Sequence, residues 1–228
     1  GYENSAKLEA IFKSIYGEGG EKEVSTADMQ KYYEDNYVNY SYLSVLLYDT
    51  STDSNNQSKN TKKSDADIKK IKSDLEKYAA DINKGTSYED EVKVYMKDYN
   101  IKTDPTITAT NILKKAGLGE DIEKTLEGLK DGQAKYITVG EGGDSATCYL
   151  LYRGSIKDEA KKLASDENTR YSVLVNMKSE EFQKDVKEQA KKVKCEVNTA
   201  AIEKYPCTNY ITEPATEAAT SAASSGSK

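Results

Sequence analysis

Residues 118–153, LGEDIEKTLEGLKDGQAKYITVGEGGDSATCYLLYR, decide the fold that the sequence predicts. The first part of this stretch has apolar side chains at helical spacing, namely Ile122, Leu126 and Leu129. Gly132 can adopt the left-handed conformation that ends a helix. Two β-rich runs follow, at 135–140 and 146–153, and the turn sequence GEGGD joins them. The stretch therefore predicts a helix followed by an antiparallel hairpin.

The rest of the chain adds a third strand and several helices. The long apolar run YSYLSVLLY at 40–48 predicts a central strand beside the hairpin. Amphipathic patterns with serine or glycine at their ends predict helices over 3–16, 25–38, 64–84, 87–99 and 118–129. We therefore expect an α+β fold in which helices cover a small antiparallel sheet.

Three segments have weaker patterns. Residues 49–63, DTSTDSNNQSKNTKK, contain no apolar side chain and are expected to form a long mobile surface loop. Residues 101–117 fit either a weak strand or an irregular loop. A helical region is predicted from Asp158, with a further helix beginning at Ser179.

The composition excludes several classes of function. The chain has 228 residues, a net charge of −6 and no histidine. The acidic balance argues against a nucleic-acid partner, and the absence of histidine excludes Ser-His-Asp and Cys-His catalysis. The three cysteines lack zinc-site spacing, so we expect no metal and no cofactor. The 18 tyrosines can bury their rings in place of scarce aliphatic side chains.

Cys195 and Cys207 are close enough in sequence to close a small disulfide loop. By chain entropy such a bridge contributes about 3 kcal/mol to stability. The alternative is that both thiols are reduced and buried.

Two stretches resemble known families. The LKDGQ turn at 129–133 and the closing strand at 149–151 resemble the C-terminal half of parvulin-type peptidyl-prolyl isomerases. EVSTADMQKYYEDNY at 23–37 resembles the helix that precedes the parvulin unit in extracytoplasmic foldases of the PrsA/SurA type. The resemblance implies a parvulin-like domain inserted in a helical lobe, followed by a disordered low-complexity tail. The implied ranges are 40–156 for the parvulin-like domain, 1–39 and 157–211 for the lobe, and 212–228 for the tail.

The resemblance also places a substrate cleft. Tyr42 and Tyr149 stand where the family has its two histidines, and Cys148 takes the second position if the register shifts by one. Ile122 replaces the family's cleft phenylalanine, and Leu118 replaces a nearby methionine. No catalytic residue can be assigned, because tyrosine does not act as an imidazole does at neutral pH. We therefore expect a degenerate, inactive isomerase domain.

The function implied by the resemblance is that of an extracytoplasmic chaperone or foldase that binds unfolded polypeptide. Two alternatives remain: an active isomerase with an altered site, and a surface-anchored interaction module that reuses the fold. The chain begins with Gly1 rather than methionine. We expect that upstream residues have been removed and that the missing segment tethers the protein to a membrane as a lipoprotein.

Overall fold

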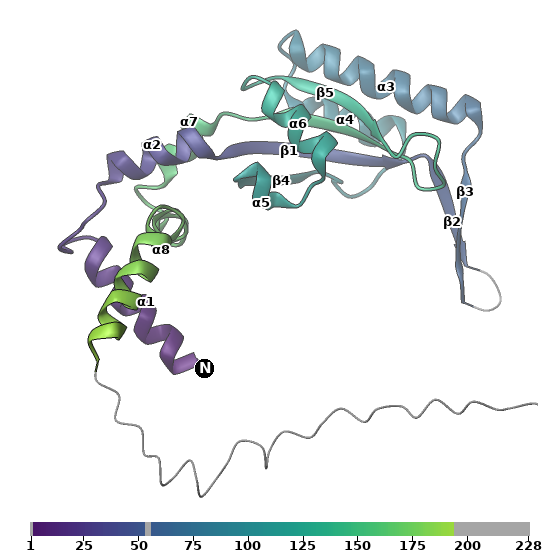
Figure 1. Ribbon diagram of the computed structural model, residues 1–228. Helices are drawn as coiled ribbons and strands as arrows, with labels where there is room; N and C mark the ends of the chain where they lie inside the picture. The colour runs from purple at the N-terminus through teal and green to yellow at the C-terminus, as the bar shows by residue number, and fades with distance from the viewer. Residues whose placement is uncertain (1, 53–55, 194–228) are drawn as a thin grey trace, which may run out of the picture. The chain divides into compact units, whose positions relative to one another are not determined.

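The computed structural model describes residues 2–52 and 56–193 (Figure 1). Cys195 and Cys207, for which a disulfide and reduced thiols were the two alternatives, and the predicted tail at 212–228 lie outside these residues. The chain forms two compact units, Gly1–Phe182 and Gln183–Lys228. The sheet and the candidate site belong entirely to the first unit.

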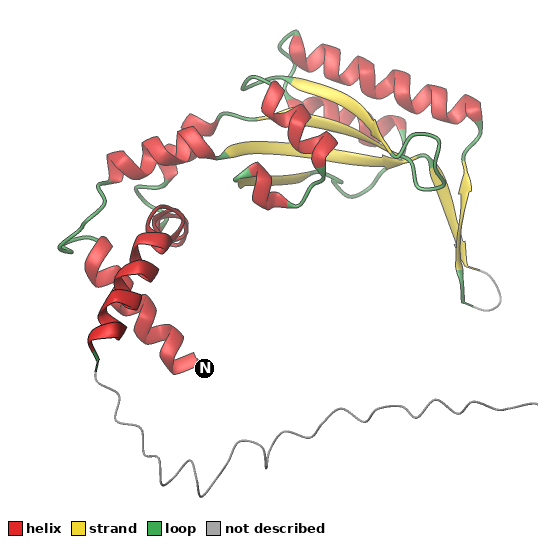
Figure 2. Ribbon diagram, viewed as in Figure 1, coloured by secondary structure: helices red, strands yellow, loops and turns green. Residues whose placement is uncertain are grey.

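Within the described residues, eight helices accompany a four-stranded antiparallel sheet and a separate two-stranded sheet, which confirms the α+β class (Figure 2). The helices are α1 (Tyr2–Tyr16), α2 (Thr26–Asn36), α3 (Asp65–Asn83), α4 (Tyr88–Asp98), α5 (Leu113–Ala116), α6 (Glu120–Gly128), α7 (Ile156–Lys162) and α8 (Glu167–Lys192). The strands are β1 (Val38–Leu46), β2 (Tyr48–Thr52), β3 (Ser58–Lys62), β4 (Ile107–Asn111), β5 (Ala134–Val139) and β6 (Thr147–Arg153). Over the same residues, no helix combines the length and the apolar character that a membrane span requires.

The main sheet has the strand order β4-β1-β6-β5, and each neighbouring pair is antiparallel. The predicted strand at 40–48 is therefore confirmed as a central strand beside the hairpin. Tyr42 on β1 lies opposite Ile107 on β4 and opposite Leu151 on β6. Serine caps begin α3 and α4: the Oγ atoms of Ser64 and Ser87 each accept a backbone hydrogen bond at 3.1 Å.

Each face of this sheet packs against its own helices. One buried cluster joins α3 and α4 to side chains such as Leu43, Val45 and Leu150. A second cluster joins α5 and α6 to residues such as Tyr40 and Leu151 on the opposite face. This two-sided burial follows from strand alternation, because neighbouring side chains point to opposite faces.

A third buried cluster lies among α1, α2, α7 and the first turns of α8. It is rich in aromatic rings: Phe12 packs edge-on against Phe182 with centroids 5.2 Å apart, and Tyr33 stacks on Tyr37 at 4.3 Å. The N-terminal helices thus share a core with helices that follow the hairpin. The finer division at residues 39/40 and 156/157 stays a prediction.

The expectation of a structureless loop at 49–63 is wrong. β2 and β3 form a two-stranded ladder in which Tyr48 lies opposite Lys62 and Thr52 lies opposite Ser58. The ladder is almost entirely exposed, so apolar periodicity could not reveal it. Backbone pairing forms the ladder instead, and the Thr50 hydroxyl donates a hydrogen bond across it to Asn60 Oδ1 at 3.1 Å.

The structure also tests the predictions for two further segments, the helix start at Ser179 and residues 101–117. No helix begins at Ser179, because α8 runs without interruption from Glu167 to Lys192. Serine followed by two acids resembles a helix start, but here it lies in a helix interior. Of the two alternatives for 101–117, a strand is present: β4 pairs with β1 as the outer strand of the sheet.

Candidate functional site

The sheet face that carries α5 and α6 is covered at one end and open at the other. At the covered end, Tyr40 is 3% exposed and Leu151 is fully buried. At the other end Leu46 is 44% exposed and Ile107 is 52% exposed. We call this uncovered part the open face; it comprises Tyr42, Ser44, Leu46, Ile107, Ile137, Val139 and Tyr149.

The strand register explains why these side chains meet. Tyr42, Ser44 and Leu46 alternate along β1 and so share one side of the sheet. Ser44 lies opposite Tyr149 on β6, which in turn lies opposite Ile137 on β5. The open face thus crosses the four strands and is mainly apolar; Thr147, which lies opposite both Leu46 and Val139, is on the same side of the sheet but is buried.

Tyr42 and Tyr149 lie together on the open face. Their ring centroids are 5.9 Å apart, with the planes at 58°, and Tyr40 stacks on the other side of Tyr42 at 6.4 Å. Both rings are half-buried. The two tyrosines therefore form an aromatic platform, a geometry that suits contact with apolar or aromatic side chains.

Leu118 and Ile122 belong to the same cluster as the two tyrosines. Leu118 is half-buried just before α6, whereas Ile122 is 5% exposed on the inner side of that helix. Leu118 can therefore contact a ligand at the border of the open face. Ile122 instead supports α6 from within the core.

Cys148 is the one cleft candidate that lies elsewhere. It is fully buried on the opposite face of the sheet, in the cluster formed with α3 and α4. Its Sγ lies 3.3 Å from the hydroxyl of Thr138. Burial raises the pKa of the thiol, so the sulfur stays protonated and is a poor nucleophile.

The chemistry of the open face is limited. None of the side chains that define it is charged. Burial raises the pKa of Tyr42 above 10, and the neighbouring Tyr40 and Tyr149 hydroxyls add to this shift. Tyr42 is therefore neutral at physiological pH, where it can donate or accept a hydrogen bond but cannot serve as a general base.

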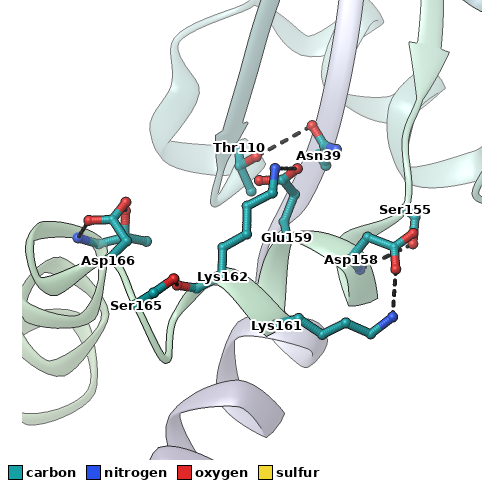
Figure 3. Close-up of polar contacts among 10 residues, drawn as sticks. Asn39, Thr110, Ser155, Asp158, Glu159, Lys161, Lys162, Ser165 and Asp166 are labelled. Atoms are coloured by element: carbon teal, nitrogen blue, oxygen red, sulfur yellow. Dashed lines mark hydrogen bonds and ion pairs between the residues drawn. The ribbon is translucent and has the colours of Figure 1, made fainter.

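Charged residues do gather near α7, as Figure 3 shows, but their contacts are those of an ordinary helix surface. Ser155 caps α7 by accepting a hydrogen bond from the Asp158 N–H at 3.3 Å. The ammonium groups of Lys161 and Lys162 lie 2.7 Å and 2.5 Å from carboxylates one turn earlier. Such spacing stabilises a helix and does not indicate an active site. Among residues 2–52 and 56–193, no acidic, cysteine or histidine group could hold a metal ion.

Sequence reasoning missed five residues of the open face, namely Ser44, Leu46, Ile107, Ile137 and Val139, of which Leu46 and Ile107 are the most exposed apolar ones. A signal for Leu46 was present, because it shares the parity of Tyr42 along the strand. Ile107 could have been found from the alternation TITAT at 106–110, had that segment been assigned to the sheet. Comparison of the chain with models of protein families, with curated proteins and with solved structures finds no match.

Proposed function

We propose that the protein is a foldase-like chaperone that binds unfolded polypeptide, and that residues 40–156 form a parvulin-like unit without isomerase activity. The observation that carries this proposal is the open face, an uncharged surface with Leu46 and Ile107 about half exposed beside two tyrosine rings. Exposed apolar surface of this kind marks binding sites, and unfolded chains present apolar side chains to it.

The order of the elements supports the parvulin-like assignment. β1 precedes the helix pair α3 and α4, and α6 then leads into the hairpin of β5 and β6. This is the order that the resemblance implies for the family. An extracytoplasmic location and a lipoprotein tether are carried over from the resemblance alone.

The chemistry of the site favours holding a client over isomerising it. Rotation about a prolyl bond must overcome the amide resonance, a barrier of about 18–20 kcal/mol for peptide bonds. A cleft lowers such a barrier with polar groups placed to favour the twisted amide. Tyr42 and Tyr149 offer hydroxyls in place of the two imidazoles of the family, and no charged group accompanies them on the open face.

Two assays on the full chain test the proposal. Light scattering of thermally unfolding citrate synthase measures client holding, and we expect the protein to suppress the rise in scattering. Exchange spectroscopy on a proline tetrapeptide measures isomerisation, and we expect the spontaneous rate. Unchanged scattering at a several-fold molar excess of protein would refute the chaperone function. A prolyl exchange rate well above the spontaneous one, lost in Tyr42→Ala or Tyr149→Ala, would show an active isomerase instead.

A further inference from the structure

The edge of β1 that faces β4 is only partly paired. On one side, β6 pairs with β1 as far as Leu46. On the other side, β4 pairs with β1 only as far as Tyr42. Within the described part of the chain, residues 43–46 therefore have no strand partner on the β4 side.

The hydrogen-bond pattern shows which backbone groups face this edge. The Leu47 N–H donates to the Ala146 carbonyl at 2.9 Å, and the Gly154 N–H donates to the Asn39 carbonyl at 2.9 Å. Odd-numbered residues of β1 thus point their backbone groups toward β6. Because these directions alternate in an antiparallel ladder, the N–H and C=O groups of Ser44 and Leu46 point toward the unpaired edge.

Pro105 explains why β4 stops where it does. Continuing the β4 register beyond Tyr42 and Ile107 would place Pro105 opposite Ser44. This is a hydrogen-bonded position of the ladder, and proline has no N–H to donate there. The edge at Ser44 and Leu46 is therefore left open by the sequence of the neighbouring segment.

A cavity of about 570 Å³ lies beside this edge, on the face of the sheet that carries α3 and α4. Its apolar lining comes from Val45, Ile71, Tyr95, Tyr99 and Ile101. An added strand would point the side chain opposite Val45 into this cavity, and the side chains opposite Ser44 and Leu46 onto the open face.

The charges around the cavity balance. Two lysines and two aspartates line it, and the Lys63 ammonium pairs with Asp49. The Lys70 ammonium lies 2.6 Å from Asp74, and the Asp67 carboxylate accepts a hydrogen bond from Ser64 at 2.6 Å. A neutral rim with an apolar floor complements an uncharged segment with apolar side chains.

We propose that an extended, uncharged segment of an unfolded client adds to the sheet as a strand along Ser44–Leu46. The client's backbone completes the hydrogen bonds of Ser44 and Leu46, and its alternate side chains enter the cavity and cover the open face. This mode of recognition accepts many sequences, because main-chain groups supply the shared contacts. The inference rests on the proposed function and adds the binding mode. A second copy of the chain is a poorer occupant. A stable interface buries roughly 800 Å² of surface on each partner, and the area buried at an edge with two hydrogen-bonding residues falls far short of this.

Amide hydrogen exchange of the full chain, followed residue by residue by NMR, tests the proposal. The probes are an acetylated and amidated Ser-Val-Thr-Val-Thr-Val-Ser peptide and reduced, carboxymethylated α-lactalbumin, which stays unfolded. At saturation, exchange of the Ser44 and Leu46 amides should slow by about tenfold or more. The Leu43 and Val45 amides serve as internal controls, because β6 already protects them and their exchange should not change.

A matched pair of variants tests the same edge. Ser44→Pro removes the free N–H, while the hydrogen bonds to β6 come from the odd-numbered residues and remain. It should weaken peptide binding by about tenfold or more, whereas Ser44→Ala, which keeps the N–H and removes only the hydroxyl, should weaken binding much less than Ser44→Pro does. Thermal unfolding reports whether Ser44→Pro is folded, and if it is not, the exchange measurement decides alone.

The outcomes separate the edge from the wider function. If the carboxymethylated client binds while exchange at Ser44 and Leu46 is unchanged, the edge proposal is overturned and the chaperone function stands. If neither probe binds and citrate synthase still aggregates, both proposals fail. A third outcome would overturn the proposal of an unfolded client and assign the edge to a second copy of the chain. In that case the Ser44 and Leu46 amides would be protected without any probe, their protection would rise with protein concentration, and sedimentation would show a dimer.

Discussion

Replacing the two most exposed apolar side chains of the open face should weaken client binding while leaving the fold intact. The variant is the double substitution Leu46→Ser and Ile107→Ser. The two side chains are 44% and 52% exposed, so about half of each is already packed in the free protein. A client strand along β1 would cover the remaining half.

The size of the effect follows from these exposed fractions. Complete burial of a leucine or isoleucine contributes about 1.5–3 kcal/mol. Covering about half of each side chain therefore contributes about 0.7–1.5 kcal/mol per residue, or about 1.4–3 kcal/mol for both. Since 1.4 kcal/mol corresponds to a factor of ten, the double variant should raise the Kd about 10- to 150-fold.

Fluorescence anisotropy of labelled, carboxymethylated α-lactalbumin measures this Kd directly. Val94→Ser is the control, because Val94 is 39% exposed on α4, outside the open face. Leu8→Ser with Ile11→Ser is a second comparison, with side chains 47% and 49% exposed on α1. A Kd of the Leu46/Ile107 variant within twofold of wild type would refute the argument. A large loss in the Leu8/Ile11 variant alone would move the client surface to α1.

Three further predictions concern stability. Leu126→Ala, at a fully buried position of α6, should lower the free energy of unfolding in urea by about 2–5 kcal/mol. A loss below 1 kcal/mol would contradict the burial of Leu126 in the core. Ser87→Ala should cost about 1 kcal/mol, because it removes the cap of α4, and Ser87→Asp should restore stability in the same urea assay. Contacts with Lys178 and Lys22 lower the pKa of Glu181 from 4.5 to about 2, so its contribution is present above pH 4.5 and is lost as the pH falls toward 2. The Tm difference between wild type and Glu181→Gln should therefore shrink between pH 6 and pH 2.5, and a constant difference would contradict this linkage.

The helices and the hairpin could be predicted because their side chains follow the periodicity of the elements that bury them. α3, with Ile71, Leu75 and Ile82 buried along one side, is found within one residue of its predicted ends. The hairpin was found in the same way, since Leu150 and Leu151 face two different cores and leave an apolar run. Burial determines the pattern in each case.

Elements that bury little could not be predicted by the same reasoning. The ladder of β2 and β3 has no apolar residue beyond its first tyrosine, so its pairing left no periodic signal. The candidate site was partly predictable: Tyr42, Tyr149, Leu118 and Ile122 were expected together and share one cluster. The position of Cys148 depended on a register that only strand pairing fixes, and a shift of one residue exchanges the two faces.

The central position of β1 has a consequence for how the chain must be made. β1 is complete at Leu46, yet its main partner is β6, and Tyr40 pairs with Arg153 more than 100 residues later. Contacts this distant in sequence form slowly and only after both partners exist. At a synthesis rate of about 5–20 residues per second, the nascent strand waits roughly 5–20 s for its partner. During that interval the apolar run at 40–48 has no partner strand to cover it, which leaves the nascent chain open to aggregation.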